Sequence, residues 1–143
     1  MRCGIEADVI GGYEFGMLAI EILSARQRSR HDPDIRATVT YAFHTFLSHW
    51  CVPLRESLSG LKQVYMTALE SGDLQHAALS SYRHSQHLMY VGCPLVELKT
   101  EADLNGLAIE QTALPNSLSW NNSVRQFARN LMGETPDPCL LTG

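Results

Sequence analysis

The chain has 143 residues, of which 45% are hydrophobic and 18% charged, and its formal net charge is −4. This length suits a single domain that buries roughly 70% of the surface its unfolded chain would expose, and the composition excludes a disordered chain. Basic residues are scattered except for the run "RQRSR" at 26–30. We interpret that run as a solvated turn, so nucleic acid is not an expected partner.

The sequence carries no sign of a membrane or secretory segment. No window approaches the ~20 apolar residues of a membrane span, and residues 1–12 include Glu6 and Asp8 where a signal peptide would be apolar. We therefore expect a cytoplasmic protein that does not associate with membranes. The four cysteines stand singly, which favours reduced thiols over a disulfide, zinc knuckle or redox pair. They are Cys3, Cys51, Cys93 and Cys139.

Apolar residues recur at helical spacing along the chain, and the alternation typical of strands is nowhere sustained. A first helix is expected over about 12–27. Its inward residues are predicted as Phe15, Leu18, Ala19, Ile22 and Leu23. Asp32 before Pro33 reads as an N-cap with proline at the first helical position, and it predicts a second helix to about residue 51. The inward stripe of that helix is predicted as Ile35, Val39, Ala42, Phe43, Phe46, Leu47 and Trp50.

Two further helices are predicted on either side of a very short turn. Pro53 can open a helix over about 54–71, and Gly72 can then adopt the left-handed conformation that ends a helix. Asp73 can cap the next helix, over 74–91, so the two helices should be antiparallel neighbours. The inward residues predicted for the earlier helix are Leu58, Leu61, Tyr65, Ala68 and Leu69.

Two more helices complete the predicted fold. One starts at Pro94 and reaches about residue 112, although Gly106 weakens its middle. The last follows "ALPNS" with Asn116 or Ser117 as its cap. The inward residues expected for these two helices are Leu95, Leu98, Ala102, Ile109, Trp120, Val124, Phe127, Ala128 and Leu131. We thus expect an irregular segment over 1–11, a helical-repeat domain over 12–133, and a loose tail over 134–143.

Six helices joined by short turns predict an all-α protein of antiparallel helix pairs. Such pairs are typical of a solenoid in which each pair buries its apolar face on the next, and a helical bundle is the competing arrangement. Ala68, Ala77 and Ala78 beside the Gly72–Asp73 turn are similar to the close helix packing of tetratricopeptide repeats. We therefore expect a tetratricopeptide-like solenoid fragment, although the full repeat consensus is absent.

Three of the six histidines lie on the predicted helix 74–91, which raises the question of a chemical site. At ~100° per residue, His76, His84 and His87 fall outside the predicted buried stripe, so we expect them on a solvated face. That stripe consists of Leu74, Ala78, Ser81, Ser85, Leu88 and Met89. Only His84 and His87 could share an ion, and two ligands without a third are a weak zinc signal.

No catalytic motif is recognisable in the sequence. His44 and His49 diverge by ~140° on one helix, and the chain has no phosphate loop, nucleophile elbow or zinc-protease helix. We expect no enzyme, no catalytic or metal-binding residue and no cofactor. A histidine-phosphotransfer bundle stays open as an alternative, although "LMYVG" after His87 lacks the lysine typical of such domains and "HDPDIRAT" around His31 is not a phosphoacceptor box.

Three segments carry a resemblance to a family. They are "FLSHWCVPL" at 46–54, "ALESGDLQHAA" at 68–78 and "GCPLVEL" at 92–98. Over about residues 12–140 the chain resembles the tetratricopeptide-like helical region of large bacterial multi-domain signalling proteins. Those proteins join a serine/threonine-kinase-like domain, an ATPase, a GAF sensor and often a histidine kinase. The resemblance implies that their catalytic residues have no counterparts in this chain.

The functional expectation follows from that resemblance. We expect a non-catalytic helical scaffold or relay segment of a signal-transduction protein, whose partners are neighbouring ATPase and sensor domains or a signalling protein. A free-standing protein–protein interaction module is the alternative that also suits a short solenoid. Because the ends of a solenoid fragment expose helix faces, self-association through those ends is expected as well.

Overall fold

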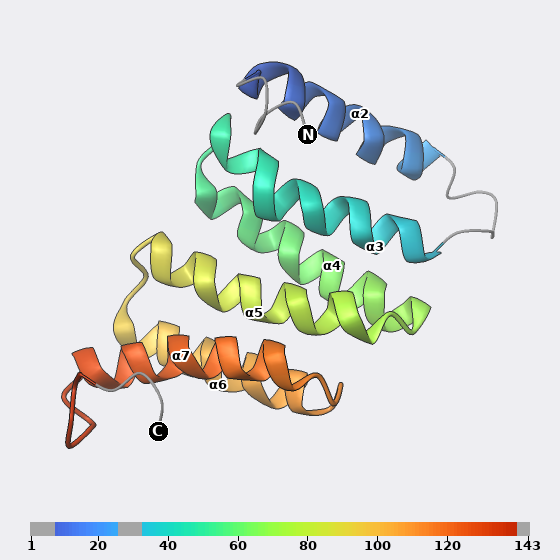
Figure 1. Ribbon diagram of the computed structural model, residues 1–143. Coiled ribbons are helices and arrows are strands. Elements are labelled where there is room, and N and C mark those ends of the chain that lie inside the picture. The colour runs from blue at the N-terminus through green and yellow to red at the C-terminus, as the bar shows by residue number, and fades with distance from the viewer. Residues whose placement is uncertain (1–7, 26–32, 140–143) are drawn as a thin grey trace.

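The computed structural model describes residues 8–25 and 33–139. Within these ranges the chain is helical and contains no strand, which confirms the all-α prediction. Figure 1 shows the helices stacked one after another from the N-terminus to the C-terminus. The α-helices are α2 (Val9–Ala25), α3 (Pro33–Ala42), α4 (Ser57–Ser71), α5 (Leu74–Tyr90), α6 (Leu95–Glu110) and α7 (Pro115–Leu131).

The turn between α4 and α5 has the geometry that its sequence predicts. Gly72 has φ +78°, in the left-handed region, and its N–H donates to the carbonyl of Leu69 at 3.1 Å. Asp73 then accepts a hydrogen bond from the backbone N–H of His76 at 3.0 Å, which is the N-cap interaction. The turn therefore satisfies orphan backbone groups of both helices, and it sets α4 and α5 side by side.

Two predicted helix caps have other outcomes. Asp32, the predicted cap of α3, lies outside the described residues. The prediction of Asn116 or Ser117 as the cap of α7 is wrong, because this helix starts at Pro115 and Leu114 occupies the cap position without a side-chain hydrogen bond. Proline at the first helical position replaces the cap here, since it lacks one of the N–H groups that a cap would satisfy.

The second predicted helix changes its pitch halfway. After α3 ends at Ala42, the chain forms a π-helical turn, η2 (Phe43–Leu47), and then a 3₁₀ turn, η3 (Ser48–Trp50). A π turn holds an extra residue, so the side chains beyond it point in directions that an ideal α-helix would not give them. A further 3₁₀ turn, η4 (Leu54–Glu56), leads into α4.

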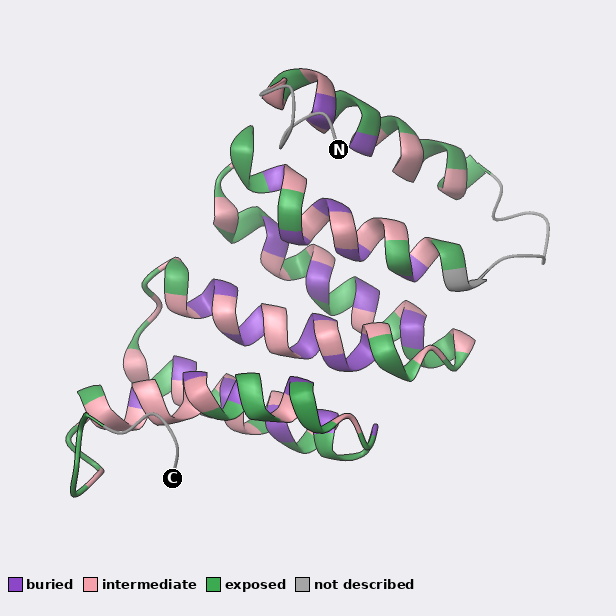
Figure 2. Cartoon of the chain, viewed as in Figure 1, coloured by how far each residue is buried: buried purple, intermediate pink, exposed green. Residues whose placement is uncertain are grey.

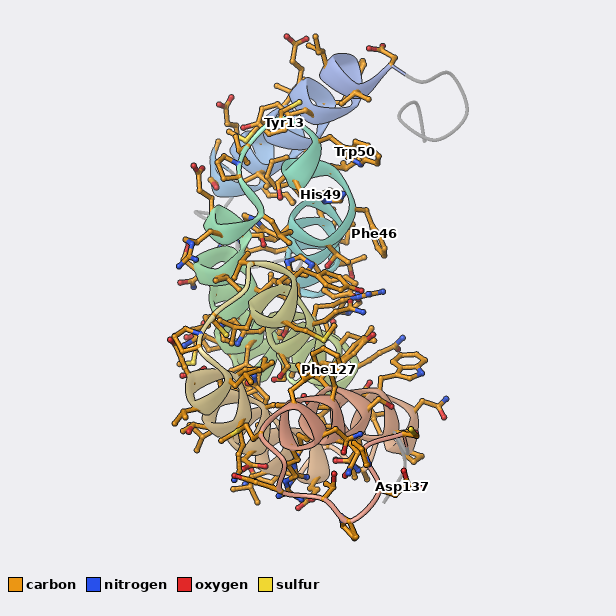
Figure 3. All side chains as sticks on the ribbon, turned by 90° about the vertical axis from the view of Figure 1, so that its left-hand side faces the viewer. Tyr13, Phe46, His49, Trp50, Phe127 and Asp137 are labelled. Carbon is orange, nitrogen blue, oxygen red and sulfur yellow. The ribbon has the colours of Figure 1, made fainter. Side chains whose placement is uncertain are left out.

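The helices form two layers. Helices α3, α5 and α7 lie on one side and α4 and α6 on the other, as Figures 1 and 3 show from perpendicular directions. Each helix packs on its neighbours in the sequence, and α5 also packs on both α3 and α7. Within the described chain α4 and α6 pack less closely, although Lys62 of α4 pairs with Glu101 of α6 at 3.2 Å. The α3/α5/α7 layer is therefore the more continuous of the two, and α2 packs on α3 and η2 at one end of the stack.

The core is divided among the helix contacts, so buried residues follow the stack rather than forming one central cluster (Figure 2). Small side chains let helices approach closely: Ala37, Ala68 and Ala77 are all fully buried between α3, α4 and α5. The largest cluster joins α5, α6 and α7. It consists of Leu88, Leu98, Ala102, Val124 and Ala128.

The inward face predicted for the first helix is wrong. Phe15, Leu18 and Ile22 are exposed, whereas Gly12 and Gly16 are buried. The side of α2 that carries the glycines is the packed side, because the aromatic ring of Phe43 can approach the backbone only where there is no side chain. A Cβ on Gly16 would lie 2.5 Å from the ring of Phe43. Close approach of an aromatic ring to backbone thus outweighs the burial of larger apolar side chains on this helix.

Several predicted core positions on the other helices are also exposed. They are Ile35, Phe46, Trp50, Leu69, Leu74, Trp120 and Leu131. For Phe46 and Trp50 the π turn gives a physical reason, because it changes the direction of the side chains that follow it. The remaining predicted core of α6 is confirmed, with Leu98, Ala102 and Ile109 buried and the helix continuous through Gly106.

Residues 132–139, the described part of the segment after α7, contain no helix or strand, but side chains connect them to the last helices. Thr135 donates to Asn130 at 2.8 Å, and the Asn130 amide donates to the carbonyl of Pro138 at 2.8 Å. Glu134 pairs with Lys99 of α6 at 2.5 Å. Across the described ranges, none of the helices is long and apolar enough to cross a membrane.

Candidate functional site

Five side chains form a continuous row across the α3/α5/α7 layer, and we call this row the aromatic face: Phe46, Trp50, Tyr82, Arg83 and Trp120. The guanidinium of Arg83 lies 5.6 Å from the ring centre of Phe46 and 5.2 Å from that of Tyr82. Tyr82 in turn lies 5.4 Å from the ring of Trp120 on α7. Phe46 and Trp50 extend the row beyond α5, onto the turns that follow α3 (Figure 3).

The rings at both ends of the aromatic face are open to solvent. Trp50 is 59% exposed, Phe46 52% and Trp120 47%. Large aromatic side chains stabilise a protein mainly when they are buried, so such exposure contributes little to the fold. Trp, Tyr and Arg are also the residues that most often dominate binding energy at protein interfaces. The composition and exposure of the row therefore favour a protein-binding surface.

The local backbone explains why Phe46 and Trp50 point outward. The π turn Phe43–Leu47 places Phe43 on the buried side, next to Gly16, and Phe46 on the solvent side. The indole N–H of Trp50 donates to the backbone carbonyl of Phe46 at 3.1 Å, so the indole is held against the turn that carries Phe46. π turns are rare and often lie at functional sites.

Arg83 is held in place without an acidic partner. Its Nε–H donates to the hydroxyl of Tyr41 at 3.3 Å, and its terminal N–H donates to Oε1 of Gln86. In the part of the chain that the structure describes, no carboxylate forms an ion pair with this guanidinium. The aromatic face thus has a positioned, half-buried positive charge at its centre.

Charged residues are divided unequally between the layers. The segments Pro33–Trp50, α5 and α7 contain four arginines and a single acid. Those residues are Arg36, Arg83, Arg125, Arg129 and Asp34. Helices α2, α4 and α6 instead contain seven acids and two lysines. These are Glu14, Glu21, Glu70, Glu97, Glu101, Asp103, Glu110, Lys62 and Lys99. Although the whole chain is acidic, the aromatic face belongs to its basic layer.

The predicted position of the α5 histidines on a solvated face is wrong for His84 and His87. His84 and His87 are each only 4% exposed. The helical spacing of the sequence predicts one buried stripe on this helix. In the structure α5 packs on α3, α4, α6 and α7, so most of its circumference is covered. His76, nearer the start of the helix, is half-buried and lies 2.6 Å from Oδ2 of Asp73.

His87 forms a short hydrogen bond with Ser57 across the α4–α5 contact, with Nδ1 and Oγ 2.6 Å apart. The serine hydroxyl also donates to the carbonyl of Leu54 at 2.6 Å. A hydroxyl has one proton, so this arrangement makes Nδ1–H of His87 the donor to Ser57. Burial, aided by the nearby charge of Arg83, lowers the pKa of His87 to about 4, so its ring is neutral at pH 7.

This pair does not have the features of a nucleophilic site. Ser57 is 1% exposed, and its proton is directed to a backbone carbonyl rather than to a base. The charged groups that affect His87 are Arg83 and other histidines, so among the described residues the ring has no acid beside it of the kind that orients the histidine of a catalytic triad. The Ser57–His87 hydrogen bond instead joins the beginning of α4 to the end of α5.

His84 joins α5 to α6. Its Nδ1 lies 3.2 Å from the amide nitrogen of Asn105, which also donates to the hydroxyl of Ser85 at 2.9 Å. Glu101 approaches the same Nδ1 at 3.8 Å and pairs with Lys62 of α4 at 3.2 Å. Burial, with a further contribution from the charge of Lys62, lowers the pKa of His84 to about 4.

The other histidine and cysteine side chains show no shared arrangement. His44 packs its ring against Gly60, its Nδ1 is buried without a hydrogen-bond partner, and burial lowers its pKa. His49 is exposed beside Trp50. Within residues 8–25 and 33–139 no three His, Cys, Asp or Glu residues are grouped to hold a metal. Cys51, Cys93 and Cys139 are free thiols, and His31 and Cys3 lie outside the described residues.

The sequence contains one signal for the aromatic face that a single-stripe interpretation misses. On α5 a second row of residues recurs at helical spacing beside the predicted buried stripe. It comprises Leu79, Tyr82, Arg83, Gln86 and Tyr90. A row of this kind predicts a second packed or binding face on the helix.

Comparisons with protein families, with characterised proteins and with solved structures found no match to this chain.

Proposed function

We propose that this chain is a non-catalytic, tetratricopeptide-like helical scaffold that binds protein through its α3/α5/α7 layer. The observation that carries the proposal is the aromatic face, on which Arg83 lies against exposed Phe46 and half-buried Tyr82, and Tyr82 in turn contacts exposed Trp120. Repeat proteins bind partners on surfaces that extend over several repeats, which a continuous layer of helices provides. The contacts of α5 with α3 and α7 give this chain such a layer.

The proposed setting is a multi-domain signal-transduction protein. Its support is the resemblance of segments 46–54, 68–78 and 92–98 to the helical region of such proteins. In that setting the scaffold would bind the neighbouring ATPase and sensor domains. Nearest-neighbour packing suits a relay, because a shift at one helix contact can bias the next one. A free-standing interaction module would use the same aromatic face.

A photo-crosslinking experiment tests the binding surface. Benzoylphenylalanine replaces Trp50 or Trp120 on the aromatic face, and Met66 or Val96, which are exposed on α4 and α6, in matched control variants. We expect defined protein adducts, identified by mass spectrometry, from the two positions on the aromatic face only. Equal adducts from all four positions, or none from any, would contradict the proposal.

The signalling context has its own test. Sequencing of the genomic DNA on both sides of this coding segment should find an ATPase, kinase or GAF domain in the same reading frame. Stop codons directly flanking the segment would favour the free-standing module. Because this result concerns the parent protein alone, it leaves the crosslinking test of the aromatic face unaffected.

A histidine-phosphotransfer role has less support. Phosphotransfer needs a histidine that a partner's active site can reach, and His84 and His87 are buried and hydrogen-bonded to Asn105 and Ser57. His76 is half-buried and paired with Asp73. Acid-labile phosphate on any of these histidines after incubation with a phosphodonor kinase would reverse this ranking.

A further inference from the structure

We infer that the partner segment bound by the aromatic face is acidic, with a carboxylate seated on Arg83 and apolar side chains on either side of it. This inference rests on the proposed function and adds the chemistry of the partner. Its first support is the state of Arg83. The guanidinium is fixed by Tyr41 and Gln86, both neutral, and forms no ion pair with a carboxylate of the described chain.

An arginine held in this way can bind an anion from outside the chain at little entropic cost. Its side chain is already ordered, so binding costs less rotamer entropy than at a flexible surface arginine. The guanidinium can still offer N–H groups in the fork that suits a carboxylate. By contrast, Arg125 pairs with Asp103 at 2.7 Å, and Arg129 approaches the same carboxylate at 3.8 Å. Arg83 therefore differs from the arginines of α7 in having no acidic partner.

The charge of the surroundings points to the same partner. Apart from Asp34 near its start, the segment Pro33–Trp50 contains no acid, and neither α5 nor α7 contains one. The acids of α4 and α6 belong to the other layer, and those of α2 belong to the helix at one end of the stack. An acidic segment would therefore meet little electrostatic repulsion on the aromatic face. Repulsion between like charges across an interface is what disfavours a wrong partner.

The spacing of the rings sets the length of the segment. Packed helices lie about 8–10 Å apart, so the two steps from α3 to α5 and from α5 to α7 span roughly 16–20 Å. An extended chain covers this span with about five or six residues at ~3.3 Å each. We expect an apolar residue on Phe46 and Trp50, a Glu or Asp near the middle on Arg83, and a second apolar residue on Trp120.

Fluorescence anisotropy with the full chain tests this inference. The probe is a fluorescein-labelled peptide with Leu at both ends of a span of about six residues and Glu and Asp in its centre. One matched peptide has Lys at the two central positions, and another has Ser in place of both Leu residues. We expect the acidic peptide to bind at least about tenfold more tightly than either control peptide, and less tightly as salt rises.

Variants of the protein locate the bound peptide. Arg83→Gln should weaken acidic-peptide binding about tenfold or more, whereas Arg55→Gln, on an exposed arginine before α4, should leave it unchanged. Circular dichroism and the melting temperature show whether each variant is folded. The comparison of acidic and lysine peptides on the unmodified protein does not depend on any variant.

Each alternative occupant gives a different result. Equal binding of the acidic and lysine peptides would overturn the acidic partner but leave a protein-binding face in place, because the crosslinking at Trp50 and Trp120 is a separate measurement. Tighter binding of labelled oligothymidine, lost in Arg83→Gln, would identify the face as a single-strand nucleic-acid platform and overturn the inference. A dimer that Arg83→Gln dissociates in light scattering would identify a second copy of this chain as the occupant and also overturn it.

Discussion

Nδ1 of His87 and the hydroxyl of Ser57 lie 2.6 Å apart across the contact between α5 and α4, and both side chains are almost completely buried. The serine hydroxyl donates a hydrogen bond to the carbonyl of Leu54 and accepts one from the histidine, so it joins His87 to the backbone before α4. A polar pair in such a place is stable only while both partners are satisfied. The hydrogen bond therefore fixes how α4 and α5 meet, directly beneath Arg83 and the aromatic face.

Replacing Ser57 tests that structural role. Ser57→Ala leaves the buried Nδ1–H of His87 without an acceptor, and we expect a loss of about 1–3 kcal/mol in the free energy of unfolding, measured by urea denaturation. Ser59→Ala is the matched control, because that exposed hydroxyl contacts only the carbonyl of Glu56 at 3.3 Å. Equal stability of the two variants would contradict the role assigned to Ser57.

The buried histidines make the fold sensitive to acid. The pKa values of His84 and His87 are lowered to about 4, against an ordinary value of 6.5 in the unfolded chain. Between these values the unfolded chain binds more protons than the folded one, so stability falls as the pH falls. Above pH 6.5 both states are neutral at these residues and the effect is absent. Below pH 4 the loss reaches its limit, roughly 3 kcal/mol for each histidine.

Melting temperatures between pH 7.5 and 4.5 measure this dependence. The double variant His84→Gln/His87→Gln should lose most of the pH dependence in this range, even if it is less stable at pH 7. His76→Gln serves as the control, because that histidine is half-buried and lies beside Asp73. An unchanged pH profile in the double variant would show that other groups cause the acid sensitivity.

The fold class and the turn at Gly72–Asp73 could be predicted because they depend on local chemistry. A left-handed glycine followed by a capping aspartate has one favoured backbone geometry, whatever surrounds it. The burial of His84 and His87 could not be predicted in the same way. It depends on α5 having neighbours on several sides, and the periodicity of a single helix does not report how many neighbours that helix has.

The aromatic face was hidden for a related reason. Phe46 and Trp50 fit the apolar stripe of an ideal α-helix, so their spacing predicts a position in the core. The π turn at Phe43–Leu47 and the 3₁₀ turn at Ser48–Trp50 change the pitch between Ala42 and Trp50 and expose both side chains. No residue pattern in this stretch marks a π turn. The first residue of that turn, Phe43, packs over Gly16 of a distant segment, and the periodicity of one helix does not report such a contact.

Gly60 is a second place where a ring replaces a side chain. A Cβ at this position would lie 2.2 Å from Nε2 of His44, so Gly60→Ala forces the ring to move. Alanine also favours the helix by up to about 1 kcal/mol, but displacement of a packed ring costs about 1–3 kcal/mol, and we expect net destabilisation. Urea denaturation of Gly60→Ala, His44→Ala and the double variant separates these effects. The double variant should be more stable than the sum of the single changes predicts, and strict additivity would contradict the contact.

Asp73 has two roles that two substitutions distinguish. Its Oδ1 accepts the backbone N–H of His76 at 3.0 Å, and its Oδ2 lies 2.6 Å from the ring of the same histidine. Asp73→Asn keeps the cap and loses the charge, whereas Asp73→Ala loses both. We expect Asp73→Ala to cost about 1–2 kcal/mol and Asp73→Asn a smaller amount, by thermal or urea denaturation. A larger loss in Asp73→Asn than in Asp73→Ala would mean that the cap is not the main contribution.

Substitutions of Gly72 test how much the left-handed backbone conformation of the same turn contributes to stability, without any effect of side-chain packing. Its φ of +78° disfavours residues with a side chain, yet a Cβ there would have no heavy atom within 4 Å. Gly72→Ala should therefore cost about 1–2 kcal/mol through the left-handed conformation alone. Gly72→Asn should cost less, because asparagine tolerates this conformation better than alanine does. If both variants unfolded at the same urea concentration as the unmodified chain, the left-handed turn would not be needed to hold α4 and α5 together.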